Sequence, residues 1–154
     1  MKMMKLSLLV LAGAIQLSAC TSDQGREPGE GPTEQEQHVL AVFNRHVAAF
    51  ESGDLDAVLS DFRDDSIVIT ADGVLEGLAQ IRRLYAGLLA EFGTIDNGDS
   101  PGIILDISHV RRDMLFITWH AESRSRVYPF GTDTFIIKRN HIARQTISFP
   151  APGQ

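Results

Sequence analysis

Apolar residues recur every three to four positions in three segments of the chain, which is the spacing of one buried helical face. The first segment covers residues 34–52 and is followed by Gly53, a residue that ends helices readily. Asp54 can then cap a short second helix that ends near residue 64. The third segment covers residues 78–92. The pattern therefore predicts three helices in the first two thirds of the chain.

Strand-forming residues dominate the remainder, together with one short stretch before the third helix. A turn signal near residues 71–73 predicts a small hairpin there. Pro129 and Gly131 mark a bulge or bend within one long strand. The four later strands are expected as an antiparallel meander over residues 103–111, 114–123, 126–138 and 142–149. Helices followed by strands predict an α+β fold, with three helices and a short hairpin packed on a curved antiparallel sheet.

The first nineteen residues have the features of a signal peptide rather than of a folded element. A short basic start precedes an apolar run of about twelve residues, well below the roughly twenty that a membrane-spanning helix needs. Residues 17–20, Leu-Ser-Ala-Cys, resemble the lipobox of bacterial lipoproteins, in which the cysteine is lipidated. The resemblance implies a lipid anchor on Cys20, the only cysteine, and Thr21 after it favours the periplasmic side of the outer membrane in a Gram-negative cell.

Residues 20–33 are rich in Gly, Pro and charge and predict a flexible linker. Residues 34–154 are enough for one domain with a hydrophobic core. The formal net charge of the chain is −6. Because nucleic acid is polyanionic, this charge argues against nucleic acid as a partner.

Several residues of the predicted domain are similar to the nuclear transport factor 2-like superfamily, which includes ketosteroid isomerases and SnoaL-like polyketide cyclases. The similarity lies in residues 44–58, Phe62, 64–65, Gly77, 81–82 and 129–135. It implies a cone-shaped α+β fold with a pocket between helices and sheet. Because this fold carries many functions, the resemblance alone does not fix an activity.

In ketosteroid isomerases an aspartate base removes a proton, while a tyrosine and a protonated aspartate hold the oxyanion. The resemblance places the oxyanion-hole acid at Asp133, the tyrosine at His46 and the base at Thr70. A threonine hydroxyl does not accept a proton at neutral pH without help. Steroid isomerisation by that mechanism is therefore not expected, and whether the chain is an enzyme stays open.

The resemblance also predicts which side chains face the pocket. Those expected to bind a ligand are Thr70, Tyr85, Phe116, Thr118 and Phe135, and the catalytic candidates are His46, His120 and Asp133. His46 is either a hydrogen-bonded core histidine or an acid of the pocket. His120 and Asp133, on adjacent strands, form either a base with its orienting carboxylate or a structural hydrogen bond. The spacing matches no known metal motif, so neither a metal nor another cofactor is expected.

Trp119 is expected on the outer sheet face, opposite the pocket, where it would support a homodimer. Three functions remain open at this point. The first is a membrane-anchored lipoprotein that binds a small apolar ligand in its cone. The second is an acid–base enzyme of the isomerase, cyclase or dehydratase type that uses His46, His120 and Asp133. The third is a dimer that acts in protein interaction or assembly.

Overall fold

A computed structural model of the chain describes residues 31–92, 102–123 and 126–150. The predicted signal peptide, Cys20 and nearly all of the predicted linker lie outside these ranges, so their assignments stay predictions. Within the described ranges, no helix is both long enough and apolar enough to cross a membrane.

Three helices form where the apolar spacing predicts them. They are α1 (Glu34–Glu51), α2 (Leu55–Ser60) and α3 (Leu78–Phe92). Helix α1 begins with a capping box, in which the Thr33 side chain accepts from the backbone N–H of Glu36 and the Glu36 side chain accepts from the backbone N–H of Thr33. Asp54 caps α2 as expected, although α2 ends earlier than predicted.

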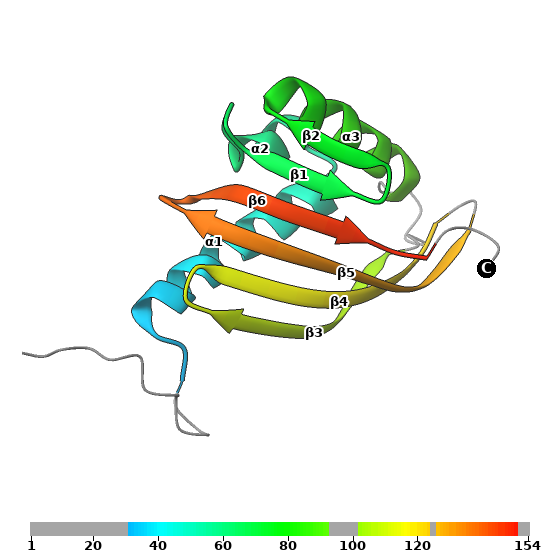
Figure 1. The fold of residues 1–154 in the computed structure, drawn as a ribbon. Coiled ribbons are helices and arrows are strands. Elements are labelled where there is room, and N and C mark those ends of the chain that lie inside the picture. Colours follow the sequence, from blue (N-terminus) through cyan, green and yellow to red (C-terminus); the bar gives the residue numbers. More distant parts are fainter. Residues whose placement is uncertain (1–30, 93–101, 124–125, 151–154) are drawn as a thin grey trace, which may run out of the picture. The chain divides into compact units, whose positions relative to one another are not determined.

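The strands form one six-stranded sheet in the order β2-β1-β6-β5-β4-β3 (Figure 1). Their bounds are β1 (Ile67–Thr70), β2 (Gly73–Glu76), β3 (Ile103–Arg111), β4 (Met114–Glu122), β5 (Val127–Lys138) and β6 (His141–Ser148). The predicted hairpin and antiparallel meander are both confirmed. The hairpin joins the meander through a parallel pairing of β1 with β6, which the sequence pattern did not predict.

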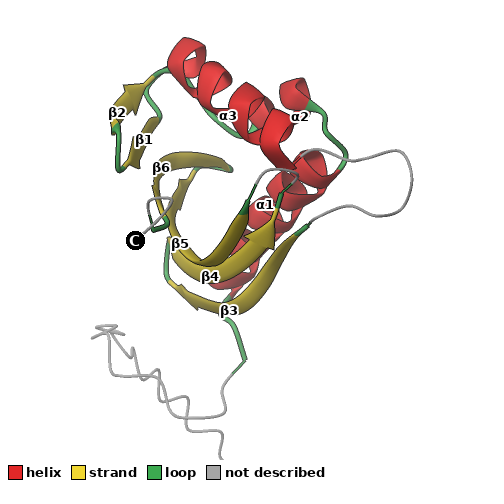
Figure 2. Ribbon diagram, turned by 90° about the vertical axis from the view of Figure 1, so that its right-hand side faces the viewer, coloured by secondary structure: helices red, strands yellow, loops and turns green. Residues whose placement is uncertain are grey.

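The predicted irregularity in the long strand is a bulge near Pro129. Trp119 pairs with Gly131, whereas Ala121 pairs with Tyr128, so β5 has one extra residue across this interval. Bulges increase local twist and bend a strand. Figure 2 shows β4, β5 and β6 curving around a concave side that faces α1.

The core fills the space between this concave side and the helices. Val39, Val42 and Phe43 of α1 are buried together with Leu115 of β4 and Phe135 of β5. The rings of Phe43 and Phe135 meet edge to face with their centroids 5.3 Å apart. The helices and sheet are therefore packed tightly at the end where α1 begins, and the open space lies toward its other end.

Candidate functional site

A cavity of about 370 Å³ lies between α1, α3 and the concave side of the sheet. This volume is within the roughly 300–1,000 Å³ of small-molecule sites. Seven aromatic side chains line it, namely Phe43, Phe50, Tyr85, Phe92, Trp119, Phe135 and Phe149. The polar side chains among the lining residues are His46, Glu51, Asp133 and Gln145. The cavity is thus largely apolar, with a few polar groups in fixed positions.

Asp133 is the buried acid of this cavity, with a relative exposure of 8%. The indole N–H of Trp119 donates to its Oδ1 at 2.9 Å, and the amide nitrogen of Gln145 donates to its Oδ2 at 2.9 Å. Burial raises the pKa of Asp133 to about 6, although the hydrogen bonds from Trp119 and Gln145 oppose that shift. The carboxyl group can therefore gain or lose a proton near neutral pH.

A second set of hydrogen bonds continues from Gln145 toward α1. The Tyr85 hydroxyl donates to Oε1 of Gln145 at 2.8 Å and lies 3.0 Å from Nε2 of His46. A tyrosine hydroxyl has a single proton. Since that proton points to Gln145, the Nε2–H of His46 must be the donor to the Tyr85 oxygen.

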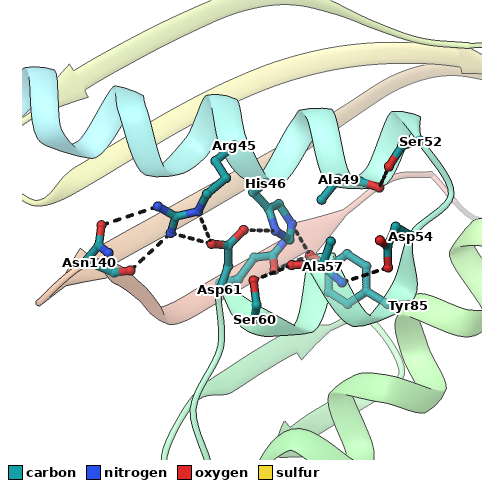
Figure 3. Close-up of polar contacts among 11 residues, drawn as sticks. Arg45, His46, Ala49, Ser52, Asp54, Ala57, Ser60, Asp61, Tyr85 and Asn140 are labelled. Carbon is teal, nitrogen blue, oxygen red and sulfur yellow. Dashed lines mark hydrogen bonds and ion pairs between the residues drawn. The ribbon is translucent and has the colours of Figure 1, made fainter.

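Asp61 completes the network on the far side of His46, as Figure 3 shows. Its carboxylate is fully buried and accepts from Nε of Arg45 at 2.7 Å, while its Oδ2 lies 3.3 Å from Nδ1 of His46. That last contact is poorly aligned for a hydrogen bond. Burial would raise the pKa of Asp61, but its interactions with His46 and Arg45 outweigh burial and lower it. Both ring nitrogens of His46 therefore face acceptors.

Asp61 contacts His46, which in turn contacts the Tyr85 hydroxyl. This arrangement matches a catalytic triad, in which an acid orients a base that activates a hydroxyl nucleophile. The surroundings of Tyr85 do not suit that role. Burial raises the pKa of its hydroxyl far above the usual value, and the charge of Asp133 raises it further. Tyr85 therefore keeps its proton and acts as a hydrogen-bond link. Within the described cavity, Asp133 is the group best suited to exchange a proton with a ligand.

The prediction that Phe116, Thr118 and His120 face the cavity is wrong. Residues directly opposite each other on neighbouring strands share a face, and Asp133 is paired with Ile117. The odd-numbered residues of β4 therefore point inward and are buried, while the even-numbered residues are half-buried or exposed on the other face.

Trp119 is consequently inside the cavity rather than on the outer sheet face, so it cannot support a dimer there. The predicted pair of His120 with Asp133 does not form either. Instead, Nδ1 of His120 lies 2.9 Å from Oδ1 of Asp106 on β3, and both side chains are at least 40% exposed.

Thr70 also lies outside the cavity lining. It is the last residue of β1, where its hydroxyl accepts from the backbone N–H of Asp72 and donates to the carbonyl of Gly73. It therefore stabilises the β1–β2 turn. By contrast, the structure places His46, Tyr85, Asp133 and Phe135 together on the cavity lining, as predicted.

Two residues of the network were not singled out from the sequence. Gln145 lies two residues before the apolar Ile147 on β6. Because residues two apart on a strand share a face, this period of two could have placed Gln145 on the inner face. Asp61 follows a short amphipathic helix, and an acidic residue at the end of such a helix is expected to be exposed to solvent. Its burial depends on α1, because Arg45 and His46 supply its partners.

In the described part of the chain, no group of three or more His, Cys, Asp or Glu side chains is arranged to hold a metal ion. His46 and Asp133 lie on the cavity, whereas His120 is on the opposite face of the sheet. The two histidines and the carboxylate considered from the sequence therefore do not form one site.

No family model matches this sequence. The structure is similar to a provisionally named polyketide cyclase from Sinorhizobium meliloti, with a TM-score of 0.58 and 23% identity over 70% of this chain and 93% of that one. It is also similar to a nuclear transport factor 2-like protein of unknown function from Burkholderia xenovorans (TM-score 0.60, 16% identity, 79% and 92% covered). A third similar structure is a provisionally named ketosteroid isomerase from Kribbella flavida (TM-score 0.61, 7% identity, 78% and 83% covered). The fold is therefore the nuclear transport factor 2-like α+β cone.

Proposed function

We propose that the domain binds a small, mostly apolar molecule in its cavity, and that the chain is exported and held at a membrane through a lipidated Cys20. The observation that carries the binding proposal is the cavity itself, which has aromatic walls and one buried, hydrogen-bonded carboxyl group. Sites for small molecules combine an apolar lining with a few placed polar groups in this way. The side chains of the described residues do not fill the cavity, so the assembly alternative loses the support that a filled cone would have given.

Native mass spectrometry of the chain as its host produces it, extracted in mild detergent, tests the binding proposal. The expected result is a bound compound that denaturation releases. Val47 lines the cavity, so Val47→Phe should fill part of the space and reduce the bound fraction. Ala48→Phe adds the same ring on the exposed side of α1 and should leave binding unchanged. Equal retention by both variants would contradict the proposal.

The anchor proposal rests on residues 17–20 and has a separate test. A lipidated chain should begin at Cys20 and carry the added mass of its acyl groups, and it should sediment with membranes. Cys20→Ser should abolish both the added mass and the sedimentation. A wild-type chain with an unmodified Cys20 thiol would show that the anchor is absent.

A homodimer through the outer sheet face remains part of the proposal, without Trp119. Met114, Phe116 and Ile136 share that face, and Met114 is 43% exposed. Apolar side chains grouped on an accessible sheet face are suited to pairing with a second copy. Light scattering after size-exclusion chromatography should give a dimer mass for the wild type and a monomer mass for Phe116→Lys.

Acid–base catalysis is the second candidate function, and the position of Asp133 favours it. A carboxyl group with a pKa of about 6 inside an apolar cavity is suited to moving a proton near neutral pH. His46 would orient and polarise the network through Tyr85, whereas His120 is too far removed to take part. Deuterium exchange next to the carbonyl of ketone probes should then be accelerated by the wild type and not by Asp133→Asn.

A further inference from the structure

Acidic side chains predominate among the ionisable groups of the described cavity lining. Of the described residues that line the cavity, Glu51 and Asp133 are acidic, and none is lysine or arginine. His46 is the remaining group that could be positive, but its two nitrogens already face Tyr85 and Asp61. Neither nitrogen is directed at a ligand. The described lining therefore offers no cation to pair with a carboxylate or phosphate.

The polar side chains around Asp133 can still accept hydrogen bonds from a ligand, but most of their donors are already used within the protein. The indole N–H of Trp119 and one amide N–H of Gln145 point at Asp133, and the Tyr85 proton points at Gln145. An ionised carboxylate has about four lone-pair sites. Since protein donors occupy one site on each oxygen, Asp133 can accept further hydrogen bonds from a ligand that carries donors.

The walls also suit a positive charge next to apolar groups. Phe50 and Phe92 line the cavity together with Trp119 and Phe135. The faces of aromatic rings attract ammonium groups, and this attraction is stronger where water is excluded. The net charge of −6 for the chain further favours the approach of cations.

We infer that the ligand of the cavity is a hydrophobic amine, bound in its protonated form with the ammonium group against the Asp133 carboxylate. The inference rests on the proposed binding function and adds the chemical class of the ligand. The ammonium group supplies the donors that Asp133 can still accept, while the apolar body of the ligand lies against the rings. A buried ion pair needs this combination of charge and hydrogen bonding to offset the loss of water from both ions.

The pH dependence of such a complex follows from the groups around Asp133. His46 and Glu51 face the cavity from α1 and Tyr85 from α3, while Trp119 of β4 and Gln145 of β6 are uncharged. Protonation of Asp133, whose pKa is about 6, removes the partner of the ammonium group. Affinity for an amine should therefore rise from pH 5 to pH 7.5.

Three probes with one apolar body separate this inference from the binding proposal. They are 2-naphthylmethylamine, 2-naphthylmethanol and 2-naphthoic acid, each titrated calorimetrically at pH 7.5 into the chain extracted from its host in detergent. Because charge-assisted hydrogen bonds are about twice as strong as neutral ones, the amine should bind roughly tenfold more tightly than the alcohol. The acid should bind more weakly than either.

Asp133→Asn is the matched variant, because it keeps the shape of the side chain and removes its charge. It should lose the preference for the amine and still bind the alcohol, which also shows that its cavity is intact. Binding of the acid as tight as that of the amine, or an amine preference that survives in Asp133→Asn, would overturn the inference and leave the binding proposal standing. Binding of none of the three probes would count against both.

Discussion

The indole N–H of Trp119 donates a 2.9 Å hydrogen bond to the carboxyl group of Asp133 inside the cavity. This bond joins β4 to β5 next to the bulge at Pro129, and it fixes one side of the only carboxyl group that is buried on the cavity lining in the described residues. The same carboxyl group is connected through Gln145, Tyr85 and His46 to Asp61. A change at one end of this network should therefore be measurable at the other.

Asp133→Asn should reverse the hydrogen bonds of the network. An asparagine whose oxygen accepts from Trp119 presents its amide N–H₂ to Gln145, so the Gln145 amide must turn and offer its oxygen. Its nitrogen then donates to Tyr85, and Tyr85 must donate to His46. Nitrogen-15 NMR should show a protonated Nε2 of His46 in the wild type and an unprotonated Nε2 in the variant. The same Nε2 signal in both proteins would contradict this description of the network.

The stability of the wild type should depend on pH through Asp133 in an unusual direction. The pKa of Asp133 is about 6 in the folded chain and 3.8 without the fold, so the folded state binds the proton more tightly. The stability contributed by this group is fully present below pH 3.8 and is lost as the pH rises to about 6. The loss is on the order of 3 kcal/mol, at about 1.4 kcal/mol per pH unit.

The comparison that isolates this effect is urea unfolding of the wild type and Asp133→Asn from pH 3.5 to pH 7. Asparagine does not titrate, so the stability of the wild type relative to the variant should fall across that interval. The carboxyl groups that lie outside the network contribute equally to both proteins. Stability curves that run parallel for the two proteins across this pH interval would show that the fold does not raise the pKa of Asp133.

Asp61→Asn should destabilise the fold by about 2–4 kcal/mol, because it removes the buried carboxylate that pairs with Arg45 and faces Nδ1 of His46. The Arg45 side chain is 47% exposed and can turn to water, which limits the cost on that side of the pair. Asp56→Asn is the matched control. It breaks a 2.6 Å pair with Arg82 in which both side chains are more than half exposed. Such a surface pair should change the unfolding free energy by less than about 1 kcal/mol, and equal effects of the two variants would argue against a buried network.

Gly131→Ala should displace Trp119, because a Cβ at this position would overlap the six-membered ring of its indole. Overpacking of this kind costs about 1–3 kcal/mol. The fluorescence of Trp119 should also change, since the chain contains one tryptophan. Gly87→Ala is the control on the exposed side of α3, where a Cβ meets nothing within 4 Å. It should stabilise the helix by up to about 1 kcal/mol and leave the fluorescence spectrum unchanged.

The fold was predictable because local patterns determine its elements. The period of 3.6 in α1 and α3, the cap at Asp54 and the bulge near Pro129 all act over a few residues. The parallel pairing of β1 with β6 depends on contacts between distant segments, for which no local pattern exists.

The candidate site was predictable only in part, for a reason that the strand register makes clear. A shift of one residue moves every side chain of a strand to the other face. The comparison with ketosteroid isomerases placed Asp133 and Phe135 inward but set β4 in the opposite alternation, which exchanged Trp119 with His120. Asp61 was missed because its burial comes from α1, not from its own short helix.

Energy transfer from Trp119 to N-phenyl-1-naphthylamine, a small apolar probe that is uncharged at neutral pH, tests most directly whether the cavity binds a ligand. Trp119 lines the cavity and is the single tryptophan, so a probe bound there should quench its emission and fluoresce in return. The account predicts saturable transfer at one probe per chain, weakened at least about tenfold by Val47→Phe, a loss of 1.4 kcal/mol, and unchanged in Ala48→Phe. Transfer that does not saturate, or that is the same in all three proteins, would contradict it.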